Sequence, residues 1–275
     1  MGRVKIAIDR EQLKSLYLGE NLTPLKIGQR LGCSFKTVRN RLKEFGIPFK
    51  NPSFARMRYP KTDYSGSLAD KAYMIGFRIG DLNVYMRSPA SETIVVRCHT
   101  TQKEQVAVMR DLFEKYGKVS ISHRGEHLTV NCFLNKSFGF LLLKDRSAWR
   151  WITKESKDVM LSFVAGYTDA EGNFIINQGR ARFKIDSYDL SILHWMSKWL
   201  TQQGIPNKFR CIYRKGDPWN GAYPLNKDLW RLNVNDKMAL KTFIDHILPF
   251  SRHAGRIRGV KLAKRNIYER EQHKK

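Results

Sequence analysis

The sequence lacks the features of secreted, disulfide-bonded and membrane-spanning proteins. Its 275 residues include four cysteines, which lie far apart without C-x-x-C spacing: Cys33, Cys98, Cys132 and Cys211. They predict neither a disulfide framework nor a zinc site. No long uncharged apolar run and no secretory signal pattern is present, so no membrane partner is predicted. We therefore expect an intracellular protein of the cytoplasm, the nucleoid or an organelle matrix, and not a secreted one.

Acidic residues are scarce as well. The chain holds 25 Asp and Glu against 50 Lys and Arg, a formal net charge of +25. Because so large an excess of one sign destabilises a compact chain by self-repulsion, we expect a polyanionic partner, and nucleic acid fits better than a membrane surface. The length allows one large domain or two to three smaller ones.

Residues 1–50 contain three short helical patterns that predict a helix-turn-helix domain. The second pattern opens with Thr23 as a cap and Pro24 at the first helical position, and Gly32 supplies a tight turn before the third. The third helix has a polar and basic outer face, which is typical of a major-groove reader. Its candidate DNA-binding residues are Lys36, Thr37, Arg39, Asn40 and Lys43. The alternative is a three-helix bundle whose basic face is only solvated.

The rest of the chain contains one order of elements twice. Residues 51–67 are rich in Pro, Ser and Gly without periodicity, and they predict a linker. The order helix, two strands, helix, two strands, helix then occurs in residues 68–153 and again in 154–275, where a basic tail follows it. The predicted fold class is therefore α+β, with duplicated αββαββα units related by a pseudo-twofold axis and a small all-α N-terminal domain.

The predicted strands alternate between apolar and polar residues. In "NKFRCIYR", for example, we expect Phe209, Cys211 and Tyr213 to point inward. Period-two alternation indicates antiparallel sheets with one solvated face. Here that face carries mainly Arg, Lys, Asn and His, which bind phosphates and base edges, although any one of them is also consistent with plain solvation. The candidate DNA-binding residues of the sheets are Arg97, His99, Asn131, Arg182, Lys184, Arg210, Arg214, Arg231 and Asn233.

Small residues recur at helical spacing in the first helix of each half. Gly76 and Gly80 lie four residues apart, and so do Gly166 and Ala170. Residues at i and i+4 share one face of a helix, so these four predict a helix interface in which two backbones approach closely. The residues that follow, Asp81 and Glu171, would then emerge side by side at the two helix ends.

Two carboxylates in that position repel each other and the negative end of each helix. A divalent cation such as Mg²⁺ relieves the repulsion, since hard cations prefer oxygen ligands. Beside a DNA-binding sheet, this arrangement predicts metal-dependent hydrolysis of phosphodiester bonds, with Asp81 and Glu171 as catalytic residues and metal ligands. The alternative is that both carboxylates face solvent and hold no metal.

The stretch "FVAGYTDAEGNF" resembles the LAGLIDADG signature, and "YMIGFRIGDLNVY" resembles a divergent copy of it. The resemblance to single-chain LAGLIDADG homing endonucleases covers about residues 68–265. It implies saddle-shaped sheets on the major groove, a monomer, and cleavage of both strands of a long double-stranded DNA target. It also implies metal binding by Asp81, Glu171 and the carbonyl groups of Gly80 and Ala170. A supporting basic residue in each half is implied too, with Lys144 or Arg146, and Arg252 or Arg256, as counterparts.

The first motif departs from the family pattern in two ways. Leu82 stands where the motif usually ends in Gly, so a left-handed helix cap is in question there, with Asn83 as a substitute. Arg78 and Ile79 replace apolar and acidic residues, whereas the second motif keeps Asp169. We expect Arg78 to face away from the helix interface or to meet a carboxylate of the other half.

Three functions are compared on this basis. The leading hypothesis is a Mg²⁺-dependent, site-specific endodeoxyribonuclease of the homing type. The alternative is a catalytically inactive LAGLIDADG protein, which acts as a DNA-binding regulator or as an RNA-splicing maturase with intron RNA as its partner. A basic architectural protein of chromatin would account for the charge but leaves the duplicated carboxylate motif unexplained.

Overall fold

The computed structural model describes residues 7–20, 22–49, 59–219 and 223–272. Parts of three predicted segments lie outside the described residues: 1–6, 21 and 50 of the predicted helix-turn-helix domain, 51–58 of the predicted linker, and 220–222 and 273–275 of the predicted second half. Contacts group the chain into two units, one of residues 1–60 with 88–92 and one of residues 61–87 with 93–275. No helix in the described ranges is long and apolar enough to cross a membrane.

The N-terminal unit consists of short helices around its own apolar core. The helices are α1 (Arg10–Lys14), the π-helical turn η1 (Ser15–Gly19), α2 (Pro24–Leu31) and α3 (Phe35–Glu44). The side chains of Thr23 and Ser34 cap α2 and α3 by accepting backbone N–H groups. The cap at Thr23 is as predicted from the sequence. Gly32 adopts a φ of 66° between these helices, a left-handed conformation that costs glycine little. The core of this unit contains Ile8, Leu13, Leu16, Tyr17, Ile27, Val38, Leu42 and Ile47.

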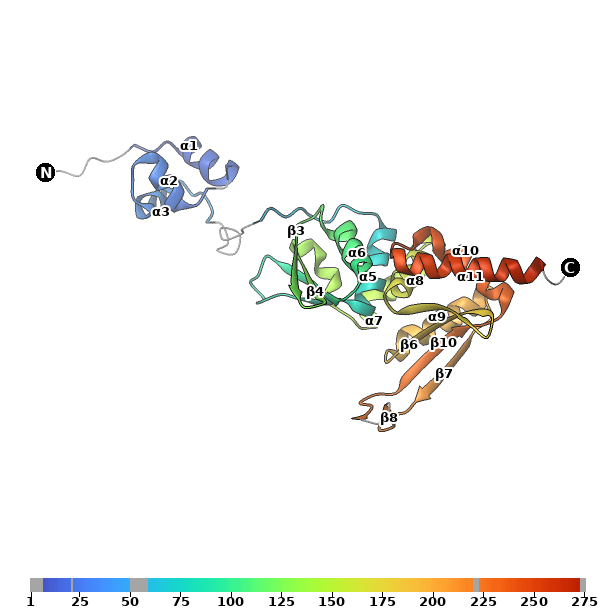
Figure 1. The fold of residues 1–275 in the computed structure, drawn as a ribbon. Coiled ribbons are helices and arrows are strands. Elements are labelled where there is room, and N and C mark those ends of the chain that lie inside the picture. The colour runs from blue at the N-terminus through green and yellow to red at the C-terminus, as the bar shows by residue number, and fades with distance from the viewer. Residues whose placement is uncertain (1–6, 21, 50–58, 220–222, 273–275) are drawn as a thin grey trace. The chain divides into compact units, whose positions relative to one another are not determined.

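The larger unit contains the two predicted halves (Figure 1). The first half comprises α5 (Leu68–Asp81), β1 (Asn83–Tyr85), β2 (Ile94–Thr100), α6 (Lys103–Phe113), β3 (Lys118–Arg124), β4 (His127–Leu134), η2 (Lys136–Leu141), α7 (Arg146–Trp149) and η3 (Arg150–Lys154). The second half comprises α8 (Lys157–Glu171), β5 (Gly172–Asn177), β6 (Arg180–Ser187), α9 (Leu190–Gln202), β7 (Lys208–Tyr213), β8 (Pro218–Trp219), β9 (Tyr223–Pro224), β10 (Leu229–Val234), α10 (Lys237–Ile247), η4 (Leu248–Phe250) and α11 (Ala254–Gln272).

The two halves have the same sheet topology. Each forms a four-stranded antiparallel sheet, with the order β1-β2-β4-β3 in the first half and β5-β6-β10-β7 in the second. In each sheet the first two strands are neighbours, and the last strand in the chain (β4 or β10) lies between the second and the third. Strands β8 and β9 form a separate pair. The duplication and the α+β fold class predicted from the sequence are therefore confirmed.

The strand alternation holds with two exceptions. In β2, Ile94, Val96 and Cys98 are buried, but Val95 between them is buried as well. Tyr213, however, is 40% exposed, so its predicted inward orientation is wrong. The register of β7 and β10 shifts between Leu229 and Trp230, which places one extra residue in β7 just before Tyr213. Such a bulge breaks the period of two and re-aims the side chain that follows it.

Residues 61–67, which precede α5, pack within the larger unit. The ring of Tyr64 lies 5.7 Å from that of Tyr116 and 5.4 Å from that of Phe138, measured between centroids. Ser67 and Asp70 then form a capping box that starts α5: the Ser67 side chain accepts from the Asp70 amide, and the Asp70 carboxylate accepts from the Ser67 amide. These contacts fix where α5 begins and therefore where it ends.

Candidate functional site

The helices α5 and α8 pack with their backbones in direct contact. A Cβ atom added to Gly76 would lie closer than 3.0 Å to the carbonyl oxygen of Phe163, and one added to Gly166 would lie equally close to that of Tyr73. A Cβ on Gly80 would overlap the Cβ of Ala170 in the same way. The predicted helix interface is therefore present, and both glycines are required because only a residue without a side chain fits there.

Neither helix ends in a left-handed cap. Leu82 after α5 and Gly172 after α8 are both extended, with φ of −99° and −71°, and Asn83 begins strand β1. Gly172 is needed for space, because an added Cβ would lie 2.6 Å from the carbonyl oxygen of Thr168. Leu82 is buried instead. The missing glycine of the first motif therefore does not prevent the chain from turning directly into a strand.

Arg78 is buried away from the helix interface. Its Nε donates to the carbonyl oxygen of Leu141 at 2.9 Å, and its Nη1 donates to that of Leu82. Burial lowers the pKa of the guanidinium, and the two carbonyl oxygens accept hydrogen bonds from two of its five N–H donors. Of the two predicted orientations, the structure shows the one that faces away, and Arg78 ties the end of α5 to η2.

The carboxylates of Asp81 and Glu171 are neighbours at the ends of the paired helices. Burial raises the pKa of Glu171, and the nearby charge of Asp81 raises it further, while Lys144 and Arg256 counteract. Asp81 is exposed as a residue, yet the protein atoms around its carboxylate raise its pKa. A hydrogen bond from Gln105 and the charges of Arg256 and Lys144 oppose this effect. Two partly desolvated anions therefore share one site, between two cations.

A pocket lies on each side of this pair. The first is lined by Asp81, His99, Thr100, Thr101, Gln102, Gln105, His127, Ala170 and Arg256. The second is lined by Ile79, Gly80, Lys144, Glu171, Ser187, Tyr188, Asp189, Leu190, Ser191 and Lys227. Asp81 thus shares a pocket with Ala170, the residue before Glu171. Glu171 shares the other pocket with Gly80, the residue before Asp81. The site has two chemically distinct halves arranged around one helix interface.

The structure selects one basic residue from each predicted pair. The Nζ of Lys144 lies 3.5 Å from the carbonyl oxygen of Gly80. Arg256 donates from Nε to the carbonyl oxygen of Asp169 at 3.2 Å and from Nη2 to that of Ala170 at 3.1 Å. Arg146 lines neither pocket, and Arg252 reaches other residues. Of the four candidates, Lys144 and Arg256 therefore contact the helix ends.

Gln105 belongs to the site but was absent from the sequence-based prediction. It is 5% exposed in α6, and its Nε2 donates to Asp81 Oδ2 at 2.8 Å. A signal for it exists in the sequence, because Gln105 shares the buried stripe of α6 with Val108, Met109 and Leu112. Residues i, i+3, i+4 and i+7 share one face of a helix, so a polar side chain at i lies on the buried face when the other three are apolar. A buried polar side chain needs a hydrogen-bond partner.

The predicted DNA-binding residues of the sheets fall into two groups. In the first group the side chains are already engaged: Arg97 donates to Asn131 at 2.8 Å and to Tyr85 at 2.7 Å, and Arg231 donates to both carboxylate oxygens of Asp186 at 2.5 and 2.6 Å. The second group is partly or fully exposed and consists of His99, Arg182, Lys184, Arg210, Arg214 and Asn233. Arg214 and Lys184 also form ion pairs, with Asp228 and Asp186.

In the N-terminal unit the predicted reading face is open to solvent. Lys36, Arg39, Asn40 and Lys43 are exposed on α3, and Thr37 is half-buried with its hydroxyl 2.9 Å from that of Ser34. Arg39 lies 5.5 Å from the ring centroid of Phe49. A basic surface of this kind suits phosphate contacts.

The residues of the site fit a divalent cation. Two carboxylates and two backbone carbonyl groups converge at the helix ends, and a cation would offset the repulsion that raises the pKa of Glu171. Within the described residues no cluster of three or more His, Cys, Asp or Glu side chains is arranged to hold a metal. The remaining ligands would come from water and substrate, which is usual for Mg²⁺.

Comparisons with known proteins identify part of the chain. Residues 158–248 match the family described as LAGLIDADG-like domain. The structure is similar to mesophilic variants of the homing endonuclease I-DmoI (TM-score 0.47, 18% identity, 66% of this chain and 96% of that chain) and to I-DmoI in complex with DNA and Mn (0.47, 18%, 66% and 97%). It is also similar to full-length DUF199/WhiA from Thermatoga maritima (0.48, 11%, 76% and 63%). No curated protein matches.

The family match begins in α8 and ends in η4, so it contains the second motif and the sheet that follows it. The equivalent order of elements in the first half and the packing of α5 on α8 agree with it. Residues 158–248 are therefore similar to the LAGLIDADG-like domain, in agreement with the family resemblance predicted from the second motif.

Proposed function

We propose that this protein is a divalent-metal-dependent, site-specific endonuclease that cuts both strands of a long double-stranded DNA target. One observation carries the proposal: the packed helices end at Asp81 and Glu171, with the Glu171 side chain against Gly80, and each carboxylate lines its own pocket beside a cation. Two pockets match two scissile phosphates, one in each strand. A protein that only binds DNA gains nothing from two desolvated anions next to the phosphates.

The carboxylates and the two carbonyl groups would hold the cation. When bound, it supplies Lewis-acid chemistry, which offsets charge on the phosphate and increases the acidity of water. Gln105 orients Asp81 through its hydrogen bond. Lys144 and Arg256 contact carbonyl oxygens at the same helix ends, where their charges stabilise negative charge that develops on a phosphate. Each carbonyl oxygen has a second lone pair, so these contacts leave it free to bind a cation.

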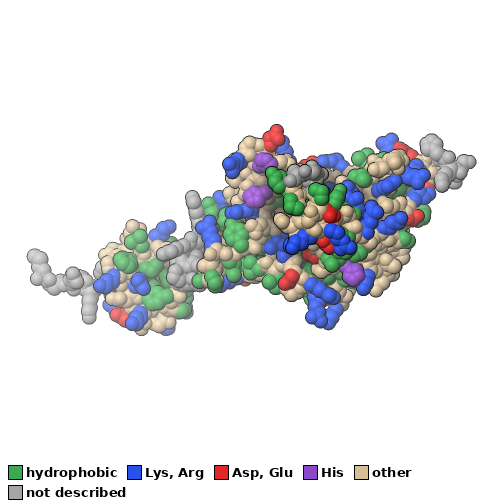
Figure 2. Space-filling model, turned by 90° about the horizontal axis from the view of Figure 1, so that it is seen from below, with side chains coloured by type: hydrophobic (Ala, Val, Ile, Leu, Met, Phe, Trp, Pro, Cys, Tyr) green, Lys and Arg blue, Asp and Glu red, His purple; other side chains and the backbone are tan. Residues whose placement is uncertain are grey.

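The charge of the surface supports a DNA substrate. Lys and Arg side chains are spread over the face shown in Figure 2, and Asp and Glu are sparse on it. The solvated face of the second sheet contributes Arg182, Lys184 and Arg210, and the exposed face of α3 would extend the contact region. Action as a monomer inside the cell is part of this proposal, because one chain supplies both carboxylates.

The test is selection of a cleavage site. The purified protein is incubated with a library of randomised duplexes and Mg²⁺, and the ends produced are sequenced. A defined double-strand break, lost in Asp81→Asn and Glu171→Gln variants that still bind the duplex, supports the proposal. Specific binding without cleavage, equal in wild type and both variants, would instead show a regulator. Preference for structured intron RNA over every duplex would show a maturase.

A further inference from the structure

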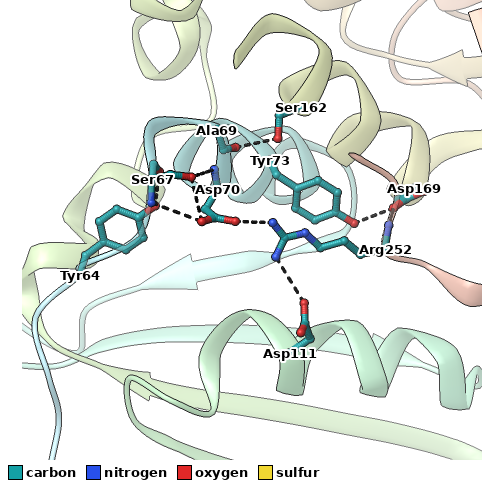
Figure 3. A network of polar contacts seen from close by, with 9 residues as sticks. All are labelled: Tyr64, Ser67, Ala69, Asp70, Tyr73, Asp111, Ser162, Asp169 and Arg252. Carbon is teal, nitrogen blue, oxygen red and sulfur yellow. Dashed lines mark hydrogen bonds and ion pairs between the residues drawn. The ribbon is translucent and has the colours of Figure 1, made fainter. Parts of the chain in front are cut away.

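A polar cluster joins the start of α11 to the first half of the protein (Figure 3). At its centre is Asp169 of the second motif, which is only 1% exposed. Its Oδ2 accepts hydrogen bonds from the Tyr73 hydroxyl at 2.6 Å and from the backbone amides of Arg252 and His253 at 2.6 and 3.0 Å. A carboxylate of α8 thus binds the two amides that precede α11, while a phenol from α5 completes the arrangement.

The side chain of Arg252 extends this cluster across the molecule. Its guanidinium lies over the ring of Tyr73, 4.7 Å from the centroid. One nitrogen donates to Asp70 at the start of α5, and the other donates to Asp111 of α6 at 3.3 Å. A single arginine of the second half is therefore held by two carboxylates and an aromatic ring of the first half. The planar fork of arginine suits such bridging, whereas a lysine would reach fewer of these partners.

One helical turn beyond Arg252, the same segment delivers Arg256 to the catalytic centre. Arg256 contacts the carbonyl oxygens of Asp169 and Ala170, and its charge acts on both Asp81 and Glu171. The backbone between these two arginines is fixed at its beginning by Asp169. Movement of the start of α11 would therefore displace Arg256.

The first half has no equivalent of this cluster, because Ile79 occupies the position of Asp169. Lys144, the cation on that side, reaches Gly80 from the loop between η2 and α7. The first motif has Ile79 where the second has Asp169. Of the two basic residues, therefore, Arg256 belongs to a segment held by such a carboxylate, and Lys144 does not.

We propose that Asp169, Tyr73 and Arg252 form a latch, and that Arg252 is a positioning residue that acts through Arg256. The latch rests on the proposed nuclease function for its effect on cleavage. It couples the docking of α11 on the first half to the placement of one cation at the scissile phosphates. Arg252 touches neither carboxylate of the site and contributes nothing to the reaction directly.

The test is a double-mutant cycle on the cleavage rate in the full chain. Arg252→Ala should lower the single-turnover rate at saturating DNA about 10- to 100-fold, the range for a removed positioning contact, with the DNA concentration at half-saturation unchanged. Arg252→Lys should restore part of the rate. Arg258→Ala is the matched control, because Arg258 also bridges α11 to α6, through Glu104, and is mostly exposed. The control should cut at the wild-type rate.

The cycle separates positioning from general stabilisation. In an Arg256→Ala background, Arg252→Ala should cause no further loss of rate, because the residue through which it acts is gone. Wild-type cleavage by Arg252→Ala, or losses that simply add, would overturn the latch. If the wild-type protein cuts no duplex, the nuclease proposal fails while the latch remains testable by hydrogen exchange. Amides of residues 254–260 should then exchange about tenfold faster in Arg252→Ala but not in Arg258→Ala, and unchanged exchange would overturn it.

Discussion

Gly76 of α5 faces the carbonyl oxygen of Phe163 so closely that a Cβ atom would not fit between them, and Gly166 of α8 faces that of Tyr73 in the same way. Phe163 and Tyr73 each lie three residues before the glycine of their own helix, so the contact is reciprocal. This contact brings the two helix ends together and makes neighbours of Asp81 and Glu171. The position of the candidate site is therefore a consequence of two missing side chains.

Adding a single methyl group at this contact should disrupt the site. Gly76→Ala and Gly166→Ala are each expected to lower the free energy of unfolding by about 1–3 kcal/mol, as overpacking does, and to reduce cleavage strongly because the helix ends separate. Gly139→Ala is the control, since an added Cβ there would meet no atom within 4 Å. Thermal unfolding and cleavage assays provide the measurement. Wild-type activity in Gly76→Ala would contradict the assignment of the interface.

The assignment of Lys144 to the site can be tested by comparison with Arg146, the other candidate of the first half. Lys144→Ala should reduce the cleavage rate by about 100-fold, as for removal of one preorganised charge contact, because it removes the cation nearest the carbonyl group of Gly80. Arg146→Ala should retain nearly full activity, since Arg146 lines neither pocket. Both rates are measured at saturating DNA. A reversed order of the two effects would show that the contact at 3.5 Å is not functional.

The carboxylate pair should reduce stability in a pH-dependent manner. The pKa values of Asp81 and Glu171 are raised in the folded state, chiefly by burial, so folding binds protons and stability falls as pH rises through the raised values. The cost is complete above the folded pKa values and absent below the ordinary values of 3.8 and 4.5. Glu171→Gln should therefore raise the melting temperature at pH 7, with a gain that shrinks on acidification.

The comparison needs a matched substitution away from the site. Glu155→Gln makes the same substitution outside both pockets. Its melting temperature should stay close to that of the wild-type protein at every pH in this range. Melting curves of the metal-free proteins from pH 7 down to about pH 4 provide the test. A melting temperature of Glu171→Gln below that of wild type at pH 7 would show that the carboxylate stabilises the fold.

The N-terminal unit should contribute affinity without contributing catalysis. It has an apolar core separate from that of the larger unit, so deletion of residues 1–50 should leave the larger unit folded. DNA affinity should fall at least about tenfold, and its salt dependence should become shallower as phosphate contacts are lost. Binding isotherms at several salt concentrations measure both effects.

A point variant locates the contact. Arg39→Ala on α3 should weaken binding, whereas Arg10→Ala, an exposed arginine of α1, should not. Complete loss of cleavage in the deletion variant, with an unchanged melting temperature of the larger unit, would show that this unit belongs to the catalytic machinery.

Some of the structure could be predicted from local patterns, and some could not. The alternation of apolar and polar residues predicted antiparallel sheets correctly, because a strand with one solvated side follows a period of two. The same rule failed at Tyr213, because a bulge depends on how β7 aligns with β10 and leaves no mark in either strand. Gln105 could have been found from its place in an apolar stripe, although its partner Asp81 lies on another helix.

The sequence by itself determined which helices meet and which acids stand at their ends, because glycines four residues apart on duplicated helices leave few other ways to pack. Only the tertiary structure decided that Lys144 and Arg256, rather than Arg146 and Arg252, reach the site. It alone also gave Arg252 and Asp169 a shared cluster with α5 and α6. The physical reason is that residue spacing fixes the face of one element, whereas the reach of a long side chain depends on how separate elements are placed.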